Sequence, residues 1–264
     1  MATLSNPVIV VSSVAAIPVG TPAGTVIVVA PTNVVVPPAA GPNVAGVGAS
    51  VYGGTTGNLS LNTPSGIVNG DYLVAFIHSQ SSAPATDFSA PAGWTRIGYT
   101  PQSLTESGNR YTVVYGQRVT DIATLPLAHT FTDVANAATG SRRVGVIVNL
   151  RGVGSGTITS SDKVSATDNL HPVIPTKACQ VGDLALSMVC ATTAAPNLGS
   201  WAAPPAGWTE HSYIAGPNVD GTTSGTWMHI IGKTATGVTS GGETATLTGP
   251  TIAADTATTL VFPR

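Results

Sequence analysis

Short apolar runs alternate with turn-forming residues along the chain, and two of these runs open on a Gly-Asp pair. They span Gly70–Ile77 and Gly182–Val189. The same five residues follow each run at a similar distance, as Pro91–Thr95 and again as Pro205–Thr209. A pattern repeated in this way indicates one supersecondary unit used twice. No window keeps a helical period over three turns, so the repeated unit is predicted to consist of strands.

Each copy of the repeat contains six predicted strands, which are short, evenly spaced and separated by Gly, Pro and Asn turns. This spacing is typical of a sandwich or a barrel. We expect an all-β fold of two tandem antiparallel β-sandwich domains, Ig-like or jelly-roll-like, behind an extended N-terminal arm. The expected divisions are 1–44 for the arm and linker, 45–155 for the first sandwich and 156–264 for the second. The predicted strands are Gly48–Tyr52, Tyr72–His78, Thr95–Tyr99, Tyr111–Arg118, Ala128–Thr132 and Val144–Leu150 in the first copy, and Thr157–Ala166, Leu184–Cys190, Thr209–Ile214, Thr226–Lys233, Glu243–Thr248 and Thr258–Phe262 in the second.

Apolar residues occupy both alternating sets of positions in the run that follows each Gly-Asp pair. Because side chains alternate along a strand, each set faces one side of the sheet. One set in the first copy is Leu73, Ala75 and Ile77, so the strand is predicted to be covered on both faces, by a second sheet on one side and by another domain or subunit on the other. The other set is expected to form one wall of each core and aligns between the copies as Tyr72, Val74, Phe76 and His78 with Leu184, Leu186, Met188 and Cys190.

The N-terminal segment lacks charge, since no Asp, Glu, Lys, Arg or His occurs between Met1 and Gly70. Its apolar stretches predict strands at Pro7–Val14 and Thr25–Ala30, and the proline-rich stretch 31–42 predicts an extended linker. The longest apolar stretch ends well short of the roughly 20 residues that a membrane-spanning helix needs. Two interpretations stay open: a pair of ordinary core strands, or an arm buried against neighbouring subunits, which we favour.

The composition supports strands and argues against one class of function. Only 8% of the 264 residues are charged, where an ordinary soluble domain has roughly 25%. Low charge with abundant Val, Thr, Ala, Gly and Pro favours strands and turns over helices. The net charge of −2 leaves no basic surface to neutralise phosphates, which argues against nucleic-acid binding. Cys179 and Cys190 lie an odd number of positions apart, so we expect two free buried thiols, as in a reducing cytoplasm.

Two tryptophans are candidate core residues, and four other aromatic residues are candidate binding residues. Trp94 and Trp208 occupy equivalent places in the two copies, directly after a turn glycine, so we expect them to anchor the two cores; sugar stacking is the functional alternative. Trp201 has no counterpart in the first copy and is expected either to be exposed for binding or to pack on a neighbouring subunit. The candidate binding aromatics are Trp201, Trp227, Tyr99 and Tyr213.

The polar residues show no pattern typical of a catalytic or metal site. No Ser has Gly two positions away on both sides, as a nucleophile elbow requires. The five histidines lie at no metal-ligand spacing, and the twelve acidic residues show no evident pair. Asp71 and Asp183 follow turns and are expected to cap backbone N–H groups. We therefore expect no enzymatic activity, no cofactor and no metal.

Several short motifs together resemble a known family. They are Gly70–Val74, Pro91–Thr95, Tyr111–Tyr115 and Asn149–Val153 in the first copy, and Ala16–Thr25 in the N-terminal segment. They are similar to motifs of β-sandwich modules in virion proteins of tailed phages, above all the minor tail and decoration proteins of phages with actinobacterial hosts. The likeness covers most of 45–264. The second copy departs from it at Leu260–Arg264, where the first copy has the Arg151–Val153 turn.

The resemblance implies a structural virion component that docks on the particle through its uncharged N-terminal segment and displays the sandwiches. Its partners would be other virion proteins of the capsid or tail, and analogy suggests a symmetric homo-oligomer such as a trimer. The implied location is the virion, assembled in the host cytoplasm, without membrane insertion. The alternative is a carbohydrate-binding host-adhesion module of the tail, which would bind surface glycans. No catalytic residues come with this family.

Overall fold

The computed structural model of the chain divides into two compact units, Met1–Ala39 and Ala40–Arg264. Among the described residues the secondary structure consists of strands and one short 3₁₀ helix, η2 (Ile122–Thr124), so the predicted all-β fold class is confirmed. The structure describes residues 8–11, 26–29, 41–53, 58–81, 88–104, 108–133, 142–165, 172–193, 200–201, 203–216, 226–245, 247–248 and 252–264.

The N-terminal unit contains two paired strands, β1 (Val8–Val11) and β2 (Val26–Val29). Both have the sequence Val-Ile-Val-Val and pair in parallel, with Val8 opposite Val26. β-branched residues favour extended backbone because two heavy atoms on Cβ restrict χ1. The two strands predicted in this segment are confirmed at these positions, and the other residues of the predicted stretches lie outside the described residues.

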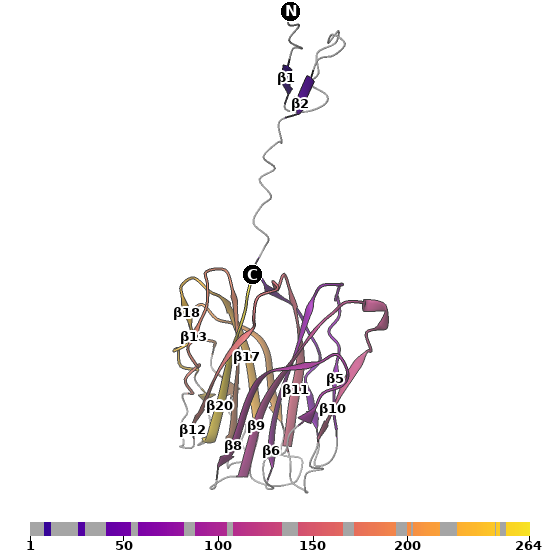
Figure 1. The fold of residues 1–264 in the computed structure, drawn as a ribbon. Coiled ribbons are helices and arrows are strands. Elements are labelled where there is room, and N and C mark those ends of the chain that lie inside the picture. Colours follow the sequence, from indigo (N-terminus) through magenta and orange to yellow (C-terminus); the bar gives the residue numbers. More distant parts are fainter. Residues whose placement is uncertain are drawn as a thin grey trace, which may run out of the picture. The chain divides into compact units, whose positions relative to one another are not determined.

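The second unit contains two large antiparallel sheets with the same strand order. Figure 1 shows β8, β9, β6 and β11 of the first sheet side by side. The order is β3-β11-β6-β9-β8 in the first half, with β4 also paired to β11, and β12-β20-β14-β17-β16 in the second. β6 and β14, the runs that follow the Gly-Asp pairs, therefore occupy the same central place. The strands are β3 (Asn43–Val47), β4 (Val51–Gly53), β6 (Tyr72–Ser81), β8 (Thr95–Leu104), β9 (Gly108–Arg118) and β11 (Arg142–Arg151), then β12 (Thr159–Ser165), β14 (Leu184–Thr193), β16 (Thr209–Gly216), β17 (Thr226–Thr234) and β20 (Ile252–Phe262).

Smaller sheets pack on one face of each large sheet and close a core within each half. In the first half, Leu61 of β5 and Phe131 of β10 share a buried cluster with Leu73 of the large sheet. In the second half, Trp201 of β15 shares a buried cluster with Ala185 of β14. The small sheets are β5-β10-β7, β13-β18 and β15-β19, formed by β5 (Leu59–Asn62), β7 (Phe88–Ser89), β10 (Ala128–Asp133), β13 (Lys177–Ala178), β15 (Ser200–Trp201), β18 (Thr239–Ser240) and β19 (Leu247–Thr248).

A third buried cluster joins the two halves, because both large sheets contribute side chains to it. Val74 and Phe76 of β6 lie in it together with Leu186 and Met188 of β14, and all four are fully buried. The opposite face of β6, which carries Ala75, belongs to the core of the first half. The central strands are thus covered on both faces, as predicted, and the second cover is the other half of the same chain. The two halves keep separate sheets but share a core.

Polar side chains bridge the two halves inside this shared core. The hydroxyls of Thr112 in β9 and Thr256 in β20 lie 2.8 Å apart, and His78 Nδ1 lies 3.2 Å from Thr112 Oγ1. Cys190, which the repeat aligns with His78, is a fully buried free thiol; burial raises its pKa, although Thr112 and Thr256 act to lower it. Cys179 is also free but only partly buried. Buried polar groups that bond across an interface fix one sheet relative to the other.

Several predicted strands differ in extent from the observed ones; Thr95–Tyr99 and Thr258–Phe262, for example, are parts of the longer β8 and β20. Gly48–Tyr52 is interrupted, because β3 ends at Val47 and β4 begins at Val51, and between them three residues (48–50) lie opposite two residues of β11 (146–147), as in a bulge. Glu243–Thr248 contributes an isolated bridge at Thr244 and the short β19. The strands β3, β5, β7, β13, β15 and β18 were not predicted.

Leu186→Ala should lower the free energy of unfolding by about 2–5 kcal/mol, because it leaves a cavity in the shared core. Leu127→Ala is the matched control at a side chain that is 91% exposed, and it should change this free energy by less than about 0.5 kcal/mol. Urea denaturation followed by circular dichroism and by tryptophan fluorescence measures both variants. Because the core is shared, the two probes should report one transition; two resolved transitions, of which only one moves, would contradict the shared core.

Candidate functional site

The two Gly-Asp pairs form the same tight turn at the start of the central strands. Gly70 and Gly182 have φ angles of +92° and +94°, in the left-handed region that favours glycine. In the first half Asp71 Oδ2 accepts the Val68 N–H at 3.0 Å, and Asp183 repeats this contact in the second half at 2.8 Å. Both carboxylates therefore cap their turns, as the sequence predicted.

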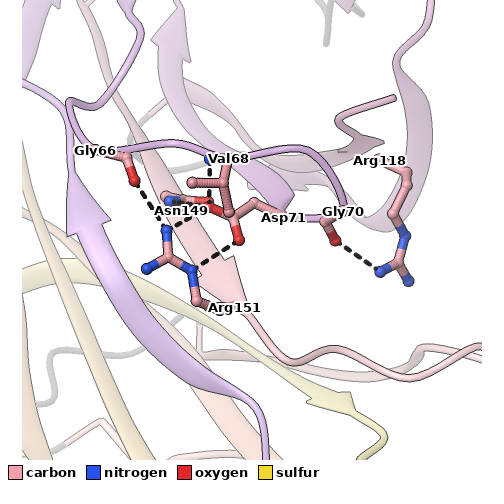
Figure 2. Close-up of polar contacts among 7 residues, drawn as sticks. All are labelled: Gly66, Val68, Gly70, Asp71, Arg118, Asn149 and Arg151. Carbon is pink, nitrogen blue, oxygen red and sulfur yellow. Dashed lines mark hydrogen bonds and ion pairs between the residues drawn. The ribbon is translucent and has the colours of Figure 1, made fainter. Parts of the chain in front are cut away.

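The Asp71 carboxylate is the centre of a polar cluster in the first half (Figure 2). Arg151 binds both carboxylate oxygens, with Nε 3.0 Å from Oδ1 and Nη2 2.9 Å from Oδ2. Asn149 Nδ2 donates to Oδ2 at 2.8 Å. Burial alone would raise the pKa of Asp71, but these hydrogen bonds, the Val68 N–H and the charge of Arg151 lower it below its ordinary value. An ionised carboxylate with this many donors is an anchor rather than a proton acceptor.

Arg118, at the end of β9, links this turn to the connection between the halves. Its Nη1 donates to the carbonyl oxygens of Gly70 at 3.1 Å and Val153 at 2.8 Å, and its Nη2 donates to that of Gly154 at 2.9 Å. The guanidinium also lies 5.2 Å from the centre of the Tyr72 ring, within the range of a cation–π contact. Arg118 and the Asp71 cluster therefore hold the strand ends and the connection together, which is a structural role.

Two of the four candidate binding aromatics are buried, so the prediction that they present a binding surface is wrong. Trp201 is 9% exposed and Trp227 is 0% exposed. Both lie in the core within the second half, on the face of β14 that points away from the shared core; we call this cluster the outer core. There Ala185 and Ala191 of β14 leave room for large rings. Trp227 also belongs to β17, which has β14 and β16 as neighbours on its two sides. Trp201 stacks on His229, with ring centres 5.4 Å apart.

The other predicted aromatic residues lie in different surroundings. Trp94 is 8% exposed in the core of the first half, and Trp208 is 6% exposed in the outer core of the second. Tyr213 is 36% exposed on β16, the last strand in the order of the second large sheet. The side chain of Tyr99 lies outside the described residues.

Tyr213, His229 and Glu210 lie together, and we call them the Tyr213 patch. His229 Nε2 is 2.7 Å from Glu210 Oε2, and the Tyr213 ring meets the His229 ring edge-on with centres 6.3 Å apart. Burial lowers the pKa of His229, although Glu210 acts to raise it, so the imidazole is neutral at pH 7 and donates from Nε2. Glu210 itself is 47% exposed. The patch therefore presents a partly exposed aromatic side chain and a partly exposed carboxylate at the surface.

Sequence reasoning missed Glu210 and His229 because a bulge brings them together. The register of β16 on β17 shifts between Glu210 and Ser212, which places Tyr213 directly opposite His229 and Glu210 diagonal to it. A bulge leaves no mark in a pattern of apolar and polar residues.

No group of three or more His, Cys, Asp and Glu side chains in the described part of the chain is arranged to hold a metal ion. Within the same residues, no helix has the length and hydropathy to cross a membrane. The chain matches no protein-family model, no curated protein and no solved structure.

Asp71→Asn should lower the free energy of unfolding at pH 7 by about 1–3 kcal/mol, because a neutral amide cannot replace the buried acceptor. The folded-state pKa of Asp71 is lowered. The ionised carboxylate therefore makes its full contribution to the free energy of unfolding above about pH 4, and this contribution is lost as the pH falls through the lowered pKa. The difference between wild type and variant should therefore shrink below about pH 4. Urea denaturation at a series of pH values measures it, with Asp162→Asn as the control at an exposed carboxylate. A difference that stays constant down to about pH 2 would contradict the ionised anchor.

Proposed function

We propose that the chain is a structural component of a tailed-phage virion, a minor tail or decoration protein. It docks on the particle through its N-terminal segment and displays the body, which we define as residues 40–264. The observation that carries the proposal is that the uncharged residues 1–39 form a compact unit of their own. The resemblance of the motifs to those of tailed-phage virion proteins is the reason for proposing a phage particle. It also implies a symmetric homo-oligomer.

The described part of the N-terminal unit is a two-stranded sheet, which is too small to be stable by itself. β1 and β2 form a two-stranded sheet, and such a pair is marginally stable in water. All eight of its residues are Val or Ile. A partner sheet that adds to one edge of this pair would supply main-chain hydrogen bonds and cover apolar side chains.

The absence of charge supports docking by strand addition. Proteins commonly protect exposed sheet edges with charged residues, especially lysine, because unpaired N–H and C=O groups invite another strand. The sequence has no charged residue before Asp71. The β1–β2 pair is therefore suited to accept a strand from another virion protein.

The contacts of the duplicated motifs support a structural role for the body. Trp94 and Trp208 fill the separate cores of the two halves. Asp71 and Asp183 cap the turns before the central strands. The residues that carry the family resemblance are thus used to build the body, which suits a display platform better than an active site.

Carbohydrate binding through the aromatic residues predicted from the sequence has less support. Trp201 and Trp227 are buried, so neither presents a ring face to solvent. Of the predicted aromatics whose side chains are described, Tyr213 is the exposed one.

Deletion of residues 1–39 should prevent incorporation into particles while the body stays folded. The amount that co-purifies with phage particles should fall by about tenfold or more, the effect of losing about 1.4 kcal/mol of binding free energy. The experiment complements a phage that lacks the gene with either the full or the shortened chain. Quantitative immunoblotting of purified particles then measures incorporation.

One further variant and one further measurement separate docking from folding. Ile9→Pro removes a backbone N–H from β1 and should reduce incorporation as the deletion does. The deleted chain should keep the thermal transition of the full chain in circular dichroism. Normal incorporation of a chain that lacks residues 1–39 would overturn the proposal.

A further inference from the structure

A pocket of about 310 Å³ lies in the first half, between the turn Pro91–Trp94 and η2. Pro91, Leu125 and Pro126 give it apolar walls, and Gln117 and His129 also line it. Its volume is at the lower end of the range of small-molecule sites, which are mostly apolar with a few placed polar groups. None of the aromatic residues predicted to bind a ligand lines it.

The tautomer of His129 is fixed by its neighbour. Trp94 Nε1 donates a hydrogen bond to His129 Nδ1 at 3.0 Å. An indole N–H can only donate, so Nδ1 must be unprotonated. Burial lowers the pKa of His129, which keeps the ring neutral at pH 7 and leaves its proton on Nε2. His129 is 4% exposed, and Nε2 has no hydrogen-bond partner among the described residues. The pocket wall thus contains a buried donor.

Gln117 supplies the complementary acceptor. Its amide nitrogen is held close to Gly93, where an added Cβ would lie only 2.7 Å from Nε2. Its Oε1 is buried and has no hydrogen-bond partner within the described part of the chain. Buried polar atoms are normally hydrogen-bonded, and both of these residues line the same pocket, so a ligand that carries a donor and an acceptor could supply the two missing partners.

The second half has an ion pair at the corresponding position. Tyr72 pairs with Arg118 in the first half as Leu184 pairs with Thr234 in the second, so Lys233 corresponds to Gln117. Lys233 lies over the Trp208 ring at 4.7 Å and forms an ion pair with Glu243. The Lys233 ammonium beside Trp208 therefore has an ionic partner, although Glu243 Oε2 has no hydrogen-bond partner among the described residues, whereas Gln117 Oε1 and His129 Nε2 beside Trp94 both lack one there.

We propose that this pocket, which we call the His129 pocket, binds one monosaccharide unit of a neutral glycan. One sugar hydroxyl accepts from His129 Nε2–H and donates to Gln117 Oε1, since a hydroxyl is both donor and acceptor. The C–H face of the sugar ring packs against Pro91, Leu125 and Pro126. A neutral ligand is proposed because the two buried atoms without partners carry no charge, and the charged groups of Arg118 and Asp121, which also line the pocket, already bind backbone atoms of the chain. The inference concerns the body alone and does not rest on the docking role of the N-terminal segment.

Saturation-transfer NMR with the full chain tests the His129 pocket. The probes are D-glucose, D-galactose, D-mannose and N-acetyl-D-glucosamine, each at about 10 mM, because a site for one sugar unit is expected to bind in the millimolar range. At least one probe should show transfer, and Gln117→Leu should weaken its binding by about tenfold or more. Long-range ¹H–¹⁵N spectra should show the His129 proton on Nε2, with a shift when that sugar is added.

A matched pair of double variants provides the control. Gln117→Lys with His129→Glu copies the ion pair of the second half into the first and should abolish sugar binding. Lys233→Gln with Glu243→His makes the reverse change in the second half and should leave sugar binding in the first half intact. If the first double variant does not fold, Gln117→Leu alone decides. Absence of transfer from all four sugars, binding that survives Gln117→Leu, or a proton on Nδ1 of His129 would each overturn the proposal.

Discussion

Coverage of the central strands β6 and β14 on both faces is the constraint on which the rest of the structure depends. A strand with apolar side chains on its two faces must be buried twice. The small sheets cover one face in each half, through clusters that include Ala75 and Ala185. The other face, with Phe76 in the first half and Met188 in the second, is covered by its counterpart. The turns, the Arg118 contacts and the pocket beside Trp94 are all placed by this arrangement.

The strand content could be predicted from the sequence because alternation and turn residues act locally. The repeat placed β6 and β14 correctly, and both sets of apolar positions predicted a cover on each face. The sequence did not show that the cover was the other half, because pairing between distant faces leaves no local pattern. Short strands such as β5 and β13 were missed since too few residues alternate in them. The predicted strand Gly48–Tyr52 was broken by an extra residue in its pairing with β11, which leaves no local pattern.

The candidate sites were less predictable than the fold. Trp201 and Trp227 were expected at the surface, but Ala185 and Ala191 leave a volume in the outer core that these rings fill. The alanines of β14 among larger apolar residues were the one feature of the sequence that indicated room for buried tryptophans. The Tyr213 patch depends on a bulge, and the His129 pocket depends on which nitrogen faces Trp94. Neither a bulge nor a tautomer can be read from the order of residues.

The halves keep common backbone contacts and differ in their polar side chains. Gly70 and Gly182 have the same conformation, and the turns that follow are capped alike. In place of the Arg151 side chain, Asp183 accepts the main-chain N–H of Arg264 at 3.3 Å. Duplication thus preserved the contacts that make the fold and released the surrounding side chains for new roles.

The shared core also limits how such genes can recombine. A crossover within 152–156, between the halves, would join the apolar face of one half to a half from another gene. The core side chains of that second half would not have evolved to pack against it. A crossover near Ala39 would leave all three clusters intact and exchange only the leading segment. Inheritance should therefore transmit the body as one block, with the leading segment free to be exchanged between lineages.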